Sequence, residues 1–173
     1  MKKYRLVVGL FLLVIVAAIG TVAVPNPLGK QILAEAKYRG YLAYTTDEAV
    51  TLAYNRCTTC HPADKMLKYC SRCGPPFVIV SHSMKKYTEL MIQKGGNFKP
   101  FSDAEVIAIT QVWNGLVGNW EPDWASKDVN KLLQGDQALI RLAETPIEKR
   151  PIELALKNKH APGSHKEDKK TAP

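Results

Sequence analysis

The stretch TTDEAVTLAYNRCTTCHP, residues 45–62, predicts the first helix of the folded part of the chain. Thr45 and Glu48 have the spacing of a capping box, in which each side chain accepts a hydrogen bond from the backbone N–H of the other residue. Apolar residues then follow at helical spacing. We expect the helix to run to about His61, because Pro62 disfavours helical conformation at the residue before it.

The end of this predicted helix is the C-x-x-C-H motif Cys57-Thr58-Thr59-Cys60-His61. Residues three and four apart share one face of a helix, so both thiols and the imidazole point to the same side. The motif is typical of c-type haem attachment, in which two thiols add to the vinyl groups of one porphyrin. We therefore expect one covalent haem c, with Cys57 and Cys60 as its thioether sites and His61 as the proximal ligand of the iron.

The four cysteines also permit a second interpretation. Cys57-x2-Cys60-x9-Cys70-x2-Cys73 has the double-knuckle spacing of a zinc ribbon, and a zinc-stapled interaction protein is the corresponding function. The helical setting of the first pair and the tendency of exported cysteines to oxidise weigh against zinc. If haem takes the first pair, Cys70 and Cys73 are expected to form a disulfide with each other or with a partner, because Gly74 stands where a second iron-binding His would be.

The next segment supplies the candidates for a second axial ligand. We expect a helix from Ser81 or Ser83 to Gly95-Gly96, since its apolar residues are spaced three and four apart. Before it, only Phe77–Val80 has the composition of a short strand.

A haem that carries electrons usually has two protein ligands, and a methionine sulfur raises its potential. We favour Met91 on this helix as the distal ligand, with Met84 and His82 as alternatives. An open distal site would instead make the protein a haem-based module that binds or senses a small ligand.

The remaining residues predict an all-α domain with a C-terminal extension. Ser102 and Glu105 form another capping box and open a third helix. We expect a small haem-binding bundle over residues 46–118, a helical extension over 119–156 and a disordered basic tail over 157–173. No acid–base or nucleophilic constellation indicates an enzyme.

The N-terminal residues predict export and anchoring. Leu6–Val24 is a run of 19 residues without a charge, long enough for a membrane-spanning helix, and Met1–Arg5 before it is basic. We expect residues 1–24 to be a signal-anchor and 25–45 a tether, with the haem domain periplasmic, on the outer face of the cytoplasmic membrane. A cleaved secretory signal is the alternative.

The net charge of +8 does not indicate nucleic-acid binding. The first five residues and the last seventeen carry most of it, each contributing a net +3, so residues 6–156 are nearly balanced. A concentrated basic face, which nucleic-acid binding needs, is not predicted.

Taken together, these motifs resemble class I c-type cytochromes, in particular the small monohaem domains of sulfite- and amine-oxidising haem proteins. The resemblance covers about residues 46–118. The segments that carry it are Cys57–His61, Glu89–Gly95, Ser102–Glu105 and Val106–Trp113. It implies a haem with His61 and Met91 as axial ligands, in a protein that passes single electrons. The implied partners are a membrane redox complex or a periplasmic electron donor and acceptor.

Overall fold

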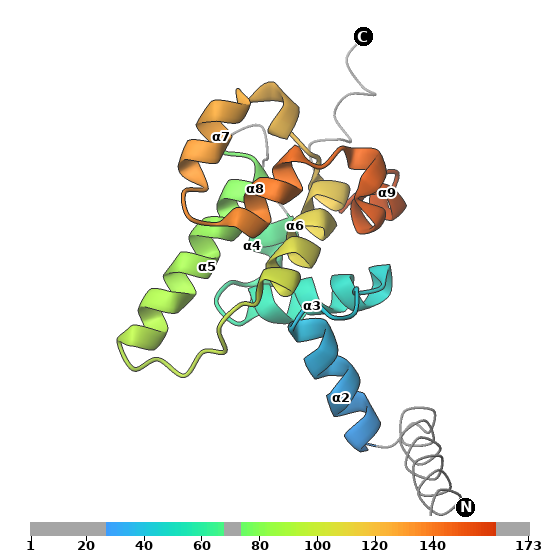
Figure 1. Ribbon diagram of the computed structural model, residues 1–173, viewed down its shortest axis with the longest axis vertical. Helices are drawn as coiled ribbons and strands as arrows, with labels where there is room; N and C mark the ends of the chain where they lie inside the picture. Colours follow the sequence, from blue (N-terminus) through green and yellow to red (C-terminus); the bar gives the residue numbers. More distant parts are fainter. Residues whose placement is uncertain (1–26, 68–73, 162–173) are drawn as a thin grey trace, which may run out of the picture. The chain divides into compact units, whose positions relative to one another are not determined.

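The computed structural model describes residues 27–67 and 74–161. Over these residues the chain is helical and contains no strand, which confirms the all-α prediction (Figure 1). The α-helices are α2 (Pro27–Tyr38), α3 (Thr46–Thr58), α4 (Ala63–Leu67), α5 (Phe77–Gln93), α6 (Asp103–Val117), α7 (Ser126–Leu132), α8 (Gln137–Glu144) and α9 (Pro151–Leu156). Two short 3-10 helices, η1 (Glu121–Asp123) and η2 (Ile147–Lys149), connect the later ones.

Both predicted capping boxes are present and fix where two helices begin. The Thr45 hydroxyl accepts a hydrogen bond from the Glu48 N–H at the start of α3, and the Glu48 carboxylate accepts one from the Thr45 N–H. Ser102 and Glu105 form the same pair at the start of α6. These reciprocal bonds satisfy backbone donors that a helix leaves unpaired at its first turn.

Helix α5 corrects one prediction from the sequence. It begins at Phe77, directly after Pro76, so neither a strand over Phe77–Val80 nor a helix start near Ser81 or Ser83 is right. Phe77 packs in one core cluster, whereas Val78 and Ile79 pack in a second cluster. A first turn that is buried on more than one side lacks the polar–apolar pattern that would have identified it as helical.

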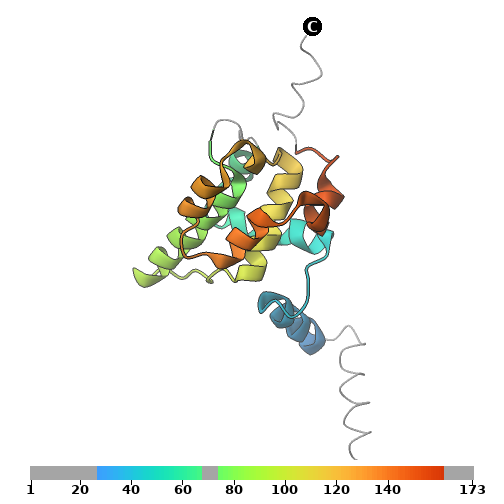
Figure 2. The ribbon, with the colours of Figure 1, turned by 45° about the horizontal axis from the view of Figure 1, so that its top comes forward.

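The core of the unit formed by residues 43–173 is organised around α6. This helix contacts α3, α5, α8 and α9, and eleven of its fifteen residues are buried (Figures 1 and 2). Ile152 and Leu156 of α9 share a core cluster with Ala53 and Cys57 of α3. The predicted C-terminal extension therefore packs into the same core as the predicted haem domain.

The two ends of the chain carry predictions that fall largely outside the described residues. The predicted membrane-spanning segment, residues 6–24, lies there, and none of the helices within 27–67 and 74–161 is long and apolar enough to cross a bilayer. Helix α2 occupies much of the predicted tether and belongs to a separate unit, residues 1–42. Of the predicted disordered tail, 162–173 lies outside the described residues, but Ala161 is buried and its N–H donates to the Leu116 carbonyl.

Candidate functional site

The C-x-x-C-H motif forms the final turn of α3 and the residues just after it. The backbone N–H groups of Cys60 and His61 both donate to the Cys57 carbonyl, at 3.3 and 3.2 Å, so the helical turn continues past Thr58. The two intervening threonine hydroxyls donate back to carbonyls of α3. This tight turn fixes the spacing of the two sulfurs and the imidazole.

The three motif side chains line one large cavity of about 900 Å³. That volume is at the upper end of the range for small-molecule and cofactor sites. Its wall is built from the end of α3, one face of α5 and the loop that joins α5 to α6. The lining residues are Arg56, Cys57, Thr59, Cys60 and His61, then Pro75, Val80, Ser83, Met84, Tyr87 and Thr88, and finally Asn97, Phe98, Lys99 and Phe101.

The structure separates the three candidates for the distal ligand. Met84 lies on the cavity wall. Met91 lies seven residues further along the same helix, about 10 Å away at 1.5 Å per residue, and is not among the lining residues. His82 faces another side of α5, where its Nδ1 lies 3.3 Å from Asp136 Oδ2. The motif and Met84 are therefore brought together, and the other two candidates are not.

A much smaller and mostly apolar cavity, of about 20 Å³, also borders Cys57 and Met84. Its other lining residues are Phe77, Phe101, Val106, Ile109 and the polar Ser81. Cys57 is only 6% exposed, whereas Cys60 is exposed. Burial raises the pKa of the Cys57 thiol above its ordinary value, and the nearby Trp113 indole and Arg56 charge oppose the rise only in part. Cys57 therefore stays a neutral thiol near pH 7.

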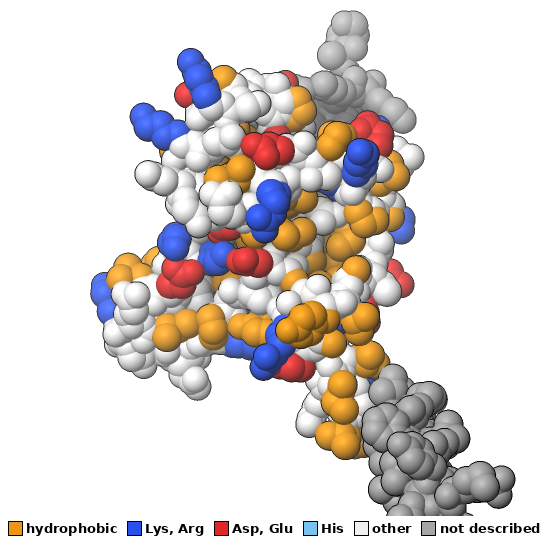
Figure 3. Space-filling view, viewed as in Figure 1, with side chains coloured by type: hydrophobic (Ala, Val, Ile, Leu, Met, Phe, Trp, Pro, Cys, Tyr) orange, Lys and Arg blue, Asp and Glu red, His pale blue; other side chains and the backbone are white. Residues whose placement is uncertain are grey.

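The charged groups at this cavity are cationic. Arg56 and Lys99 line the cavity, and none of the acidic side chains within 27–67 and 74–161 does. Elsewhere the charges are mixed: on the face drawn in Figure 3, Lys and Arg side chains are interspersed with Asp and Glu. A positive rim around an apolar hollow suits a largely apolar ligand that carries anionic groups at its edge.

These residues fit the haem that the sequence predicts. Two thiols three residues apart, the adjacent imidazole and a thioether sulfur all border one hollow, and the small, mostly apolar cavity also borders Cys57 and Met84. The zinc interpretation is not decided, because Cys70 and Cys73 lie outside the described residues. Within the described part of the chain, no group of three or more His, Cys, Asp and Glu side chains is arranged to hold a metal ion.

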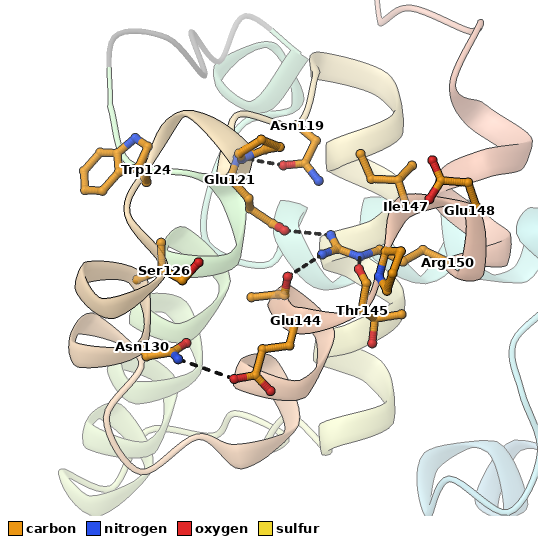
Figure 4. Close-up of a pocket in the computed structure, with 14 residues that line it drawn as sticks. Asn119, Glu121, Trp124, Ser126, Asn130, Glu144, Thr145, Ile147, Glu148 and Arg150 are labelled. Atoms are coloured by element: carbon orange, nitrogen blue, oxygen red, sulfur yellow. Dashed lines mark hydrogen bonds and ion pairs between the residues drawn. The ribbon is translucent and has the colours of Figure 1, made fainter.

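A second cavity, of about 370 Å³, lies in the C-terminal half and was not predicted from the sequence (Figure 4). Its floor is the buried Arg150, whose Nη1 lies 2.7 Å from Glu121 Oε2 and 3.2 Å from Glu153 Oε2. The same guanidinium donates to the backbone carbonyls of Ala143 and Thr145. Every Arg150 nitrogen already has a partner, so none is left to bind a ligand. These contacts link α9 to η1 and to the end of α8, and we therefore assign the cluster a structural role.

Sequence reasoning missed Arg56 and Lys99 as residues of the first cavity. Arg56 directly precedes Cys57, so its position beside the motif could be read from the sequence. The position of Lys99 on the same wall depends on how the loop folds back, which the sequence does not show.

Comparisons of the chain with protein-family models, with curated proteins and with solved structures found no match.

Proposed function

We propose that the 900 Å³ cavity holds one haem, attached covalently through Cys57 and Cys60, and that the protein transfers single electrons. The observation that carries the proposal is that both thiols, the His61 imidazole and the Met84 sulfur border the same hollow. A haem held in this way supplies a reversible one-electron carrier. The chain's own residues bind and orient it.

In this proposal His61 and Met84 would hold the haem iron. An imidazole and a thioether sulfur are ligands that would favour electron transfer, and the thioether would raise the potential of the haem. The function proposed is therefore that of an electron carrier or a redox subunit.

The proposed setting is the outer face of the cytoplasmic membrane. It is supported by the uncharged run at residues 6–24 and by the basic residues before it. An anchored domain of this kind would pass electrons between a membrane redox complex and a periplasmic donor or acceptor within reach of its tether. Retention of the full-length protein in membranes after alkaline carbonate washing, with the haem domain protease-accessible from outside, would support this setting.

The haem proposal is tested by the mass and colour of the full chain, expressed with a haem-attachment system. We expect one added haem mass and a pyridine haemochrome spectrum of the thioether type. Cys57→Ser/Cys60→Ser should lose both, and Cys70→Ser/Cys73→Ser should keep both. A colourless wild-type protein, or bound zinc that both double variants lose, would overturn the proposal in favour of the zinc interpretation.

A second measurement separates electron transfer from small-ligand sensing. If His61 and Met84 both bind the iron, we expect a reversible one-electron redox titration. The absorption spectrum of the reduced protein should then not change under carbon monoxide. Rapid carbon monoxide binding to the reduced wild-type protein would instead favour the sensing function.

A further inference from the structure

Helix α2 has an apolar side that is open to solvent. A helix turns by 100° per residue, so Leu28, Ile32 and Leu33 lie on one side of it. Their side chains are 57%, 47% and 37% exposed. Three large aliphatic side chains that gather on one side of a helix are normally covered, because their burial is what stabilises an amphipathic helix. The exposed side of α2 therefore indicates a surface that this helix contacts.

The other side of α2 is polar and the segment is basic. Lys30 and Ala34 lie opposite Ile32 and are exposed. Over residues 27–42 there are three basic side chains and one acidic side chain, which gives a net charge of +2. The single acid, Glu35, pairs with Arg39 at 2.6 Å, so the excess positive charge comes from two lysines. A basic helix with one apolar side has the pattern of a helix that lies on an anionic lipid surface.

The chain before α2 indicates that such a surface is close by. The uncharged run at residues 6–24, the proposed membrane anchor, ends three residues before Pro27. Three residues span at most about 11 Å, a distance comparable with the thickness of the lipid headgroup layer. Helix α2 has 12 residues and is about 18 Å long, so it brings its whole apolar side to the bilayer only if it lies flat.

We infer that α2 is an interfacial helix that lies flat on the outer leaflet of the membrane. Leu28, Ile32 and Leu33 then enter the boundary between headgroups and acyl chains, and the lysines extend to the anionic headgroups. This inference rests on the membrane setting of the proposed function. It also shortens the free part of the predicted tether to the few residues after Tyr38, which restricts how far the haem domain can reach for a partner.

The test compares two introduced cysteines in the full chain, reconstituted in vesicles of phosphatidylcholine and phosphatidylglycerol. Ile32→Cys places a thiol on the apolar side, and Ala34→Cys, two residues later, places one on the polar side. Each variant is treated with a charged, water-soluble maleimide, and peptide mass spectrometry measures modification at the introduced residue separately from the native cysteines. Since the thiolate is the reactive form and an apolar setting raises the pKa of a thiol, Ile32→Cys should react about tenfold more slowly than Ala34→Cys.

Two further measurements identify what covers the apolar side. Leu28→Ser/Leu33→Ser removes most of the apolar side and should bring the reaction rate of Ile32→Cys close to that of Ala34→Cys. In vesicles that contain a phospholipid with a photoactivatable diazirine on its acyl chain, irradiation of the wild type should give lipid adducts on the peptide that contains α2.

The outcomes separate this inference from the membrane setting on which it rests. Equal rates for Ile32→Cys and Ala34→Cys, in protein that stays in the membrane after alkaline carbonate washing, overturn the interfacial helix and leave the setting standing. A slow reaction of Ile32→Cys without a lipid adduct on α2 also overturns it, because another part of the chain or a second copy then covers the apolar side. Release of the wild type by the carbonate wash overturns the membrane setting, and the interfacial helix with it.

Discussion

Gly115 of α6 lies so close to Leu156 of α9 that a Cβ on residue 115 would stand 2.6 Å from the Leu156 Cβ. The Glu153 carbonyl would be 3.3 Å from the same added atom. Because both neighbours belong to one short helix, the absence of a side chain at residue 115 is what allows α9 to pack on α6. This contact joins the C-terminal extension to the helix that also supports the cavity.

We expect Gly115→Ala to destabilise the fold. Alanine raises intrinsic helix propensity by about 1 kcal/mol, but overpacking a closed contact costs roughly 1–3 kcal/mol and should dominate. The free energy of unfolding in urea measures the balance. Leu156→Gly removes the Cβ at the contact, so Gly115→Ala should cost less in that background than in the wild type. Equal costs in both backgrounds would show that the two residues do not compete for space.

A second prediction concerns Asp136, which caps α8 and anchors α5 to it. Its Oδ1 accepts from the Leu139 N–H at 3.2 Å, and Lys85 Nζ lies 3.1 Å from its Oδ2. Burial works to raise the pKa of Asp136, but the hydrogen bonds from Lys85, the Leu139 N–H and His82 outweigh it and hold the pKa below its ordinary value. Its stabilising contribution is therefore full near neutral pH and is lost as pH falls through that lowered pKa.

Asp103 offers a matched control, because it pairs with the same lysine at 2.7 Å but is 63% exposed. We expect Asp136→Ala to lower the free energy of unfolding by about 2–4 kcal/mol, from the lost cap and the lysine left without its buried partner. Asp103→Ala should cost less than about 1 kcal/mol, as surface pairs do. Similar costs for the two variants would contradict the assignment of Asp136 as the anchor.

The third prediction is a pH dependence that arises at Glu153. Burial raises the pKa of Glu153 above its ordinary value of 4.5; hydrogen bonding from Asn119 and the Arg150 charge lower it, and the Glu121 charge adds to the rise. The folded state thus binds this proton more tightly than the unfolded state does. The contribution of Glu153 to stability accordingly decreases as pH rises from 4.5 through the raised pKa.

Glu153→Gln should flatten this part of the profile, because its amide does not titrate. The measurement is the urea unfolding free energy at a series of pH values, compared with the wild type. Glu148→Gln, on the exposed 3-10 helix nearby, is the control and should leave the profile unchanged. A profile for Glu153→Gln that parallels the wild type would assign the pH dependence to other groups.

The helix boundaries show which features local sequence determines. Thr45 and Ser102 each form a capping box with the glutamate three residues later, so both helix starts could be predicted from four consecutive residues. The start of α5 was not, because Phe77 and Val78 are buried by two different core clusters that only the folded chain brings together. Local hydrogen bonding is encoded nearby in the sequence, whereas burial depends on residues far along the chain.

The cavity residues also differ in whether the local sequence or the tertiary packing determines their positions. The positions of Cys57, Cys60 and His61 on one helical turn followed from their spacing. Met84 and Met91, however, lie seven residues apart, and 3.6 residues per turn places both on nearly the same face of α5. Helical periodicity cannot choose between them, since the choice depends on how far along α5 the end of α3 approaches it.

The last prediction follows from that packing. If Met84 is the distal ligand, Met84→Leu should keep the thioether-attached haem but lose the absorption band of the oxidised protein that marks an iron–sulfur bond. The midpoint potential should also fall, and the reduced form should bind carbon monoxide. Met91→Leu, a substitution of similar volume on the same helix, should leave all three properties unchanged. The reverse pattern would show that α5 slides or rotates when haem is attached, because Met91 could reach the iron only if two turns of α5 moved toward His61.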